Sequence, residues 1–154
     1  MKVVIFAGGL GTRLSEYTGS IPKPMVPVGG KPIIWHLMNL YSKHGYKDFV
    51  IALGYRADII KNYFATYKSS MDDYSIDLST GQMTVINGSS EDWKISLIDT
   101  GELTMTGGRL KRLADVIGEE TFLLTYGDGL SDVNISDVVT QHKSSNAIIT
   151  MTTV

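Results

Sequence analysis

The chain has 154 residues, of which 43% are hydrophobic, so it is long enough to bury one substantial core and we expect one domain over residues 1–154. Its formal net charge of -2 gives no basic field that would attract a nucleic acid or an anionic membrane surface, which favours a small-molecule partner. The absence of cysteine excludes disulfides, thiolate metal ligands and cysteine nucleophiles, so any bound metal must use oxygen or imidazole ligands.

Short apolar runs, several of them rich in β-branched residues, recur along the chain. The first, residues 3–7, is too short for the core of a signal peptide, and no segment approaches the length of a membrane span. We therefore expect a cytoplasmic protein with no membrane partner. Similar runs follow at residues 49–53, 122–125 and 147–154, and their apolarity on both faces is typical of central strands in a parallel sheet.

Segments with helical periodicity lie between these runs. A weak pattern over residues 138–142 follows Asn134 and Ser136, either of which could cap a helix. Strands that alternate with helices predict an α/β fold, with a Rossmann-like, mixed but mostly parallel sheet flanked by helices. Apolar side chains share one helical face most clearly in residues 33–41, 59–67 and 110–117.

The stretch of residues 71–98 interrupts this alternation. Residues 82–86 and 94–98 are predicted to be short strands, and residues 87–90 between them have the composition of a turn. We expect these two strands to form a small β excursion before the main sheet resumes. The sequence then ends within the strand-like residues 147–154, which indicates a truncated fold.

A glycine-rich segment follows directly on the first predicted strand, where open α/β sheets place their ligand crevice. Gly8, Gly9 and Gly11 allow the backbone to turn tightly and to point amides at phosphate oxygens, and Arg13 supplies a cation for the same anion. A tight turn with a solvated arginine is the alternative for such glycines alone.

Two other phosphate-binding loops are excluded by residue counts. A dinucleotide-binding fingerprint needs a third glycine at the position of Leu14. A P-loop needs glycine at the position of Met25 and serine or threonine at the position of Pro32. The sequence therefore supports neither a Rossmann dehydrogenase nor a P-loop kinase.

All four prolines of the chain lie within residues 21–32. Lys23 stands between Pro22 and Pro24, which restrict the backbone while the lysine side chain remains free to reach an anion. This arrangement favours a phosphate clamp, and a rigid surface loop with solvated lysines is the alternative.

A third feature is an apolar strand that ends in Asp128, between Gly127 and Gly129. A carboxylate at the carboxyl end of a strand faces the same crevice as the glycine segment and could hold Mg²⁺, whose remaining ligands are usually water and phosphate. The alternative is a turn aspartate that hydrogen-bonds to its own backbone.

Together, Gly8-Gly9-Leu10-Gly11-Thr12-Arg13-Leu14 and Pro22-Lys23-Pro24-Met25 resemble the signature of the sugar-1-phosphate nucleotidyltransferases. The resemblance implies that the glycine-rich loop binds a nucleoside triphosphate and that Asp128 binds Mg²⁺. It implies catalytic roles for Arg13, which contacts the phosphates, and for Lys23, which stabilises the reacting α-phosphate. The resemblance also implies a set of residues that bind the nucleotide or the substrate: Phe6, Ala7, Gly8, Gly9, Leu10, Gly11, Thr12, Arg13, Lys23, Gly127 and Asp128.

Residues 99–112, with Trp35-His36 and residues 126–129, resemble the branch of this family that transfers a cytidylyl group from CTP to glucose 1-phosphate, giving CDP-glucose and pyrophosphate for bacterial surface polysaccharide. In that branch the residues that match Thr104 and Arg109 contact the nucleotide. The alternative for this segment is a capped helix that carries solvated cations.

The resemblance also implies a longer protein, because members of this family extend well beyond residue 154 and carry much of the sugar site and a second metal-binding aspartate there. Three readings of the chain stay open: a cytidylyltransferase, a nucleotidyltransferase for another base or sugar 1-phosphate, and a catalytically incomplete nucleotide-binding fragment. A truncated sheet would also leave an edge or an apolar face that favours assembly into a homo-oligomer.

Overall fold

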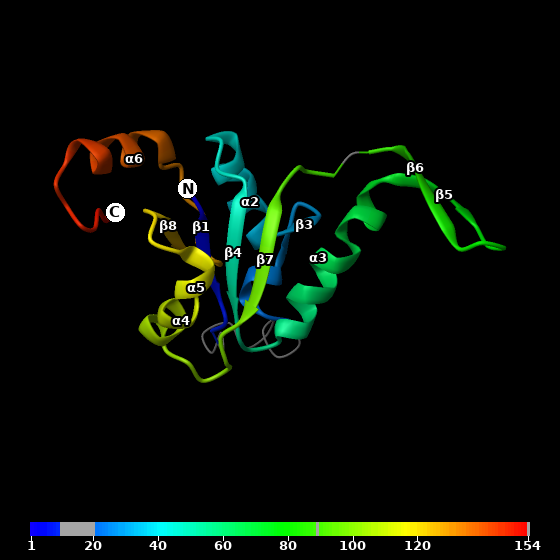
Figure 1. Ribbon diagram of the computed structural model, residues 1–154, viewed down its shortest axis with the longest axis horizontal. Helices are drawn as coiled ribbons and strands as arrows, with labels where there is room; N and C mark the ends of the chain where they lie inside the picture. The colour runs from blue at the N-terminus through cyan, green and yellow to red at the C-terminus, as the bar shows by residue number, and fades with distance from the viewer. Residues whose placement is uncertain (10–20, 89, 154) are drawn as a thin grey trace.

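A parallel four-stranded sheet forms the centre of the computed structural model, which describes residues 1–9, 21–88 and 90–153 (Figure 1). The strand order is β7-β4-β1-β8. The chain adds strands to one side of β1 as far as β7, and it then crosses to the other side of β1 to form β8. This reversal creates a topological switch point between β1 and β8. The strands are β1 (Val3–Ala7), β4 (Asp48–Leu53), β7 (Lys94–Asp99) and β8 (Leu123–Tyr126).

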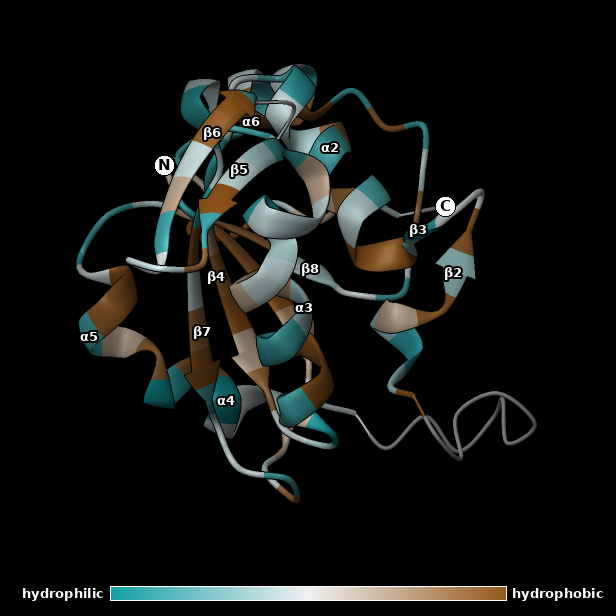
Figure 2. Ribbon diagram, turned by 90° about the vertical axis from the view of Figure 1, so that its right-hand side faces the viewer, coloured by the Kyte–Doolittle hydropathy of each residue, from teal (hydrophilic) through white to brown (hydrophobic). Residues whose placement is uncertain are grey.

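Helices cover both faces of this sheet. The helices α2 (Ile33–Lys43), α3 (Ala57–Met71) and α6 (Ile135–Ser144) pack on one face, and the short helices α4 (Thr106–Arg112) and α5 (Ala114–Ile117) belong to the other. The brown, hydrophobic strands β4 and β7 lie between α5 and α3 in Figure 2. The expected fold class, with helices on both faces of a parallel sheet, is thus confirmed.

Alternation along the strands explains the two layers of the core. Val3 and Ile5 of β1 point into the larger cluster with α2, α3 and α6, whereas Val4 points into the smaller cluster with α5. From Phe49 to Leu53 every residue of β4 is fully buried. A strand covered on both faces needs a continuous apolar run, as the sequence indicated.

The helical predictions agree with the structure apart from one break. Residues 33–41 and 59–67 lie within α2 and α3, and the Asn134 side chain caps α6 by accepting hydrogen bonds from two backbone amides. The pattern over residues 110–117 is divided at Leu113 into α4 and α5.

Residues 82–86 and 94–98 are strands as predicted, but their pairing and the strand expected after α6 are wrong. Residues 94–98 do not pair with residues 82–86, because β7 extends the main sheet in parallel register with β4. The hairpin is formed instead by β5 (Asp73–Asp77) and β6 (Gln82–Asn87) and extends away from the sheet (Figure 1). Residues 147–153 form no strand: they continue past α6 without a partner strand in the described chain.

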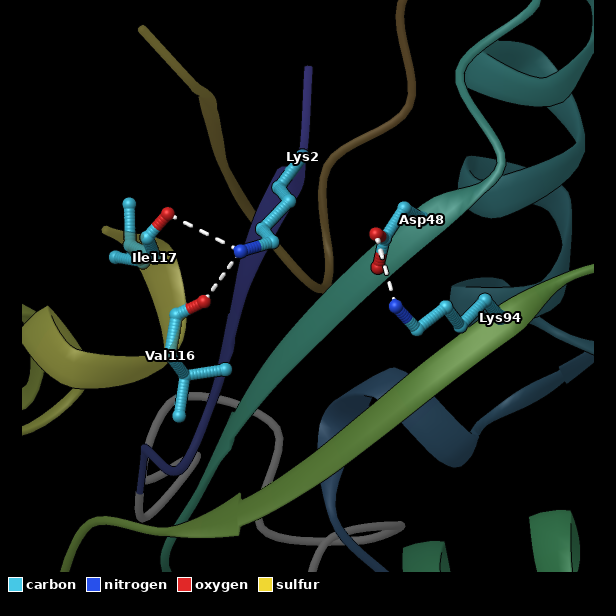
Figure 3. Close-up of polar contacts among 5 residues, drawn as sticks. All are labelled: Lys2, Asp48, Lys94, Val116 and Ile117. Atoms are coloured by element: carbon cyan, nitrogen blue, oxygen red, sulfur yellow. Dashed lines mark hydrogen bonds and ion pairs between the residues drawn. The ribbon is translucent and has the colours of Figure 1, made fainter. Parts of the chain in front are cut away.

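Side chains also join elements at the amino ends of the strands. The Lys2 ammonium donates to the backbone oxygens of Val116 and Ile117, at 2.5 and 3.1 Å, and so supplies a cation at the carboxyl end of α5 (Figure 3). Asp48 and Lys94, which are register partners in β4 and β7, form an ion pair of 3.5 Å. An exposed pair of this kind contributes little to stability. Among the described residues, no helix is long and apolar enough to cross a membrane.

Candidate functional site

The carboxyl ends of β1 and β8 meet at the switch point. Gly8 and Gly9 follow β1, and Gly127 and Asp128 follow β8. The Gly127 amide donates to the Phe6 oxygen at 2.9 Å, so the two chain segments remain side by side beyond the last pair of the ladder. The glycine turn and the aspartate predicted from the sequence are therefore brought to one edge of the sheet.

Pro24 brings the proline-rich segment to this edge. A Cβ atom added to Gly127 would lie 3.1 Å from the Pro24 Cγ and 3.1 Å from the Phe6 oxygen, so only glycine fits there without a shift. Pro24 is buried within the short 3₁₀ helix η1 (Lys23–Met25). The rigid turn is thus held by packing against the end of β8.

The packing of Pro24 places Lys23 beside Asp128. Their Nζ and Oδ2 atoms are 3.5 Å apart, and the side chains are 23% and 40% exposed. Both groups therefore remain accessible to solvent. A partly exposed lysine and a carboxylate at a switch point can contact a phosphate group and a hydrated cation, respectively.

Phe6 and Ala7 contribute to the same edge in different ways. The Phe6 ring is half-buried and packs edge-to-face against Tyr126, with ring centroids 5.8 Å apart. Ala7 is buried, which leaves its backbone as the part that can line a site.

Arg109 lies beneath the glycine turn and is only 5% exposed. Its Nη1 atom donates to the Leu53 oxygen at 2.9 Å and to Thr100 Oγ1 at 2.7 Å. Its Nη2 atom donates to the Gly8 oxygen at 2.8 Å and to the Glu102 oxygen at 3.0 Å. The guanidinium therefore joins the carboxyl ends of β1, β4 and β7.

Two glycines make room for this guanidinium. A Cβ atom on Gly8 would lie 2.2 Å from Arg109 Nη1, and one on Gly54 would lie 2.5 Å from the same atom. No ion pair among the described residues includes Arg109. The pKa of Arg109 is lowered from its ordinary value, mainly by burial. The negative charge of Asp99 opposes this shift, and the positive charge of Arg112 adds to it. Arginine nevertheless stays cationic at neutral pH, so a positive charge lies under the turn.

A second arginine of α4 shapes the loop after β7. Arg112 Nη1 donates to the Thr100 oxygen at 2.5 Å and to Thr104 Oγ1 at 2.9 Å. Thr104 is half-buried and lies in the loop that follows β7. In the sheet, β4 lies between β7 and β1, the strand that leads into the glycine turn. Arg109 is therefore not a solvated cation of the alternative interpretation, whereas Arg112 is exposed and is held by these two hydrogen bonds.

The structure thus brings together Gly8, Gly9, Lys23, Gly127 and Asp128 at the switch point, with Arg109 beneath them. Of the predicted site residues, Leu10, Gly11, Thr12 and Arg13 lie outside the described residues. The contact of the nucleotide with Arg109 stays a prediction, and all four terminal N–H positions of the guanidinium already have protein acceptors.

Sequence reasoning missed Gly54, Thr100 and Arg112. Gly54 had a usable signal, because it follows an apolar strand directly, as Gly8 does, and such glycines often mark a close approach of another group. The contacts of Thr100 and Arg112 depend on the position of α4 and have no local signature.

A metal could be held at this edge by Asp128. No group of three or more histidine, aspartate or glutamate side chains suited to a metal ion occurs within the described ranges. A single accessible carboxylate fits Mg²⁺, which usually binds proteins through one or two carboxylates and completes its shell with water and substrate phosphates.

Open α/β sheets bind their ligands outside the carboxyl ends of the strands at a topological switch point, which is where the glycine turn, Lys23 and Asp128 lie in this chain. The chain belongs to the nucleotidyl transferase family, whose pattern matches residues 2–154.

Similar proteins of this family include the glucose-1-phosphate cytidylyltransferase of Salmonella typhimurium, which is 50% identical over 99% of this chain and 60% of that protein. The probable glucose-1-phosphate cytidylyltransferase of Bacillus subtilis is 45% identical over 99% of this chain and 59% of that protein. The chain therefore spans about 60% of the length of the curated relatives that it matches.

Among solved structures, HddC from Yersinia pseudotuberculosis complexed with GMP-PN has a TM-score of 0.66 and 29% identity, over 91% of this chain and 53% of that chain. UDP-glucose pyrophosphorylase from Acinetobacter baumannii has a TM-score of 0.68 over 95% of this chain and 53% of that one. The latter is 22% identical, and its similarity shows the fold alone.

Proposed function

We propose that residues 1–154 form the nucleotide-binding part of a glucose-1-phosphate cytidylyltransferase, which transfers a cytidylyl group from CTP to glucose 1-phosphate. The observation that carries this proposal is the pairing of Lys23 with Asp128 at the switch point, beside Gly8 and Gly9. The choice of CTP and glucose 1-phosphate rests on relatives named for this reaction at 45–50% identity, whereas the guanylyltransferase relatives are 27–30% identical.

The reaction that fits this site is a direct displacement. A phosphate oxygen of glucose 1-phosphate attacks the α-phosphorus of CTP, and the bond from that phosphorus to the bridging oxygen breaks. Pyrophosphate leaves with the electron pair, and CDP-glucose is formed. No protein nucleophile is needed, so the chain contributes by placing two anions together and by stabilising the charge that develops on the α-phosphate.

The roles follow from the positions of the described groups. The backbone of Phe6, Ala7, Gly8 and Gly9 lines the triphosphate, and the Lys23 ammonium contacts the reacting α-phosphate. Gly127 allows the close approach of Pro24 that sets the position of this lysine. The contact of Thr104 with the nucleotide in this proposal rests on the family resemblance alone. Leu10, Gly11, Thr12 and Arg13 complete the phosphate loop in this proposal, on the strength of the family signature alone.

Asp128 is the proposed ligand of Mg²⁺. When bound, the ion would neutralise charge on the phosphate oxygens of CTP. The distance of 3.5 Å between Lys23 Nζ and Asp128 Oδ2 lets the lysine move from the carboxylate to a phosphate without a large rearrangement. The carboxylate therefore orients Lys23 in the absence of substrate.

The proposal is tested by incubating the purified chain with glucose 1-phosphate and CTP, UTP or dTTP in the presence of Mg²⁺ and measuring pyrophosphate release, with CTP binding measured by calorimetry. Release with CTP that exceeds release with UTP and dTTP supports the proposal. Faster release with another nucleotide means a nucleotidyltransferase of different base specificity. Binding of CTP without release means that the chain is a nucleotide-binding part only, and absence of both contradicts the proposal.

A further inference from the structure

We infer that Arg109 is a positioning residue that orients the Gly8–Gly9 peptide for phosphate binding, acting through the Gly8 oxygen rather than through the nucleotide base. This inference deepens the proposed function and rests on it. It starts from the contact of Arg109 Nη2 with the Gly8 oxygen, at 2.8 Å.

The trans geometry of the Gly8–Gly9 peptide fixes the direction of the Gly9 N–H. The described chain contains no cis peptide bonds, so the C=O of Gly8 and the N–H of Gly9 point in opposite directions. Arg109 and the Tyr55 amide, at 2.8 and 3.3 Å, both hold the Gly8 oxygen on the inner side of the turn. The Gly9 N–H therefore points away from the guanidinium, and Gly9 is exposed.

The Arg109 guanidinium is itself held in place by groups on the other side from Gly8. The guanidinium is fixed from the other side by the Leu53 oxygen and by Thr100 Oγ1, and Thr100 is fully buried and itself donates to Leu53 at 2.7 Å. A side chain held at both ends can transmit the position of α4 and the ends of β4 and β7 to the turn after β1. The orientation of the Gly8–Gly9 peptide is thus set before a ligand binds.

The buried positive charge of Arg109 also favours a phosphate at this turn. Arg109 is buried without an ion-pair partner among the described residues: its four hydrogen-bond acceptors are uncharged oxygen atoms, and the Asp99 carboxylate acts on it only from beyond ion-pair distance. A phosphate group bound above Gly8 and Gly9 would supply the missing negative charge. Because buried charges are screened less than exposed ones, this attraction persists at physiological salt.

The two modes of action for Arg109 differ in their dependence on the ligand. A positioning residue affects every ligand that uses the turn, whether or not the ligand carries a base. Replacing a residue that contacts the base changes the affinity for each nucleotide by an amount that depends on the base, and it leaves the affinity for inorganic tripolyphosphate unchanged.

The test measures the affinity of the chain for CTP, UTP and tripolyphosphate by calorimetry, in the unmodified protein and in Arg109→Met and Gly54→Ala. Arg109→Met removes the donors, whereas Gly54→Ala leaves them but adds a Cβ atom 2.5 Å from Nη1. We expect each variant to weaken all three ligands by a similar factor, on the order of 10- to 100-fold, since hydrogen bonds of a charged group are lost. Lys111→Met, at an exposed position of the same helix, is the matched control and should change no affinity.

A second readout needs no ligand. Amide hydrogen exchange at Tyr55 should become faster in Arg109→Met and Gly54→Ala, because its acceptor, the Gly8 oxygen, is no longer held, and Lys111→Met should exchange as the unmodified chain does. In the double variant the two losses should not add, since both changes displace the Gly8 oxygen: the Cβ atom at position 54 would lie 2.8 Å from that oxygen as well as close to Arg109. Circular dichroism confirms that each variant is folded, and Arg109→Lys, which retains the charge, should recover part of the affinity.

The outcomes separate this inference from the proposed function. If the unmodified chain binds none of the three ligands, the proposed function is contradicted and the positioning role with it. If it binds them and folded Gly54→Ala and Arg109→Lys bind equally well, the positioning role alone is overturned. Loss of CTP affinity with unchanged tripolyphosphate affinity would overturn it too, in favour of a direct contact with the base.

Discussion

The carboxyl end of the main sheet and the β5–β6 hairpin both lie outside the hydrophobic core, but different interactions hold them. At the carboxyl end, side chains from distant elements hold the backbone: Arg109 donates a hydrogen bond to the Gly8 oxygen, and the Pro24 ring packs on Gly127. Every residue of β5 and β6 is exposed, although Ile76 and three other apolar side chains, Tyr74, Met83 and Val85, alternate along the strands. A fixed backbone at the sheet edge is what a phosphate site requires, whereas an isolated two-stranded hairpin is marginally stable.

The largest expected effect is on catalysis at the sheet edge. In Lys23→Ala, turnover should fall by about 100-fold, because the lysine stabilises charge that develops in the transition state. The affinity for CTP should fall by much less, and comparing steady-state turnover with CTP binding checks this. Lys43→Ala, at an exposed position of α2, serves as the control. Equal loss of turnover and affinity would contradict the role of Lys23.

The next effect tests the close approach of Pro24 to Gly127. Gly127→Ala should lower the free energy of unfolding by about 1–3 kcal/mol, because the added Cβ atom overpacks the Phe6 oxygen and the Pro24 ring. Gly129→Ala meets no atom within 4 Å and should change stability by less than about 0.5 kcal/mol. Denaturant unfolding of the two variants measures the difference, and equal values would mean that this contact does not hold the segment.

A smaller effect concerns α3, which leads into the hairpin. Burial, and then the charge of Glu91, raises the pKa of Tyr63 from 10.0 to about 12. Between pH 10 and pH 12 the unfolded chain therefore loses a proton that the folded chain keeps, so stability falls as the pH rises through this window and is unaffected below it. Tyr63→Phe should reduce this alkaline loss, as measured by denaturant unfolding at pH 9 and pH 12, whereas Tyr74→Phe in the exposed hairpin should not. An identical loss in both variants would contradict the assignment.

The smallest effect is expected in the hairpin itself. Ile76→Ser should change the free energy of unfolding by less than about 0.5 kcal/mol and should leave CTP affinity unaltered, because this side chain is 49% exposed and lies on an element that the site does not use. Unfolding curves and calorimetry provide the measurements. A loss of more than about 2 kcal/mol would show that the apolar face of the hairpin is covered in solution.

The parts of the fold that the sequence predicted are those with a local cause. The buried run of β4, the periodic faces of α2 and α3 and the Asn134 cap depend on neighbouring residues. Pairing between strands was harder to predict, because residues 82–86 and 94–98 both have strand-like composition and only the register with β4 distinguishes them.

In the site, too, residues with a local signature were predictable and contacts between distant parts of the chain were not. Lys23 and Asp128 were identifiable from their proline and glycine neighbours, and the structure places them 3.5 Å apart. The burial of Arg109 was not predictable, since its acceptors Leu53 and Gly8 lie 56 and 101 residues away along the chain. Its position beside two other charged residues in α4, Lys111 and Arg112, is typical of a solvated helix face.

The central claim is that the edge of the sheet between β1 and β8 binds the nucleotide. Amide chemical-shift mapping of the chain during a titration with CTP and Mg²⁺ tests it most directly. We predict that the largest shifts occur at Gly8, Gly9, Gly127 and Asp128 and that residues 73–87 of the hairpin do not shift. Shifts confined to the hairpin and α3, or no shifts at saturating CTP, would contradict this account.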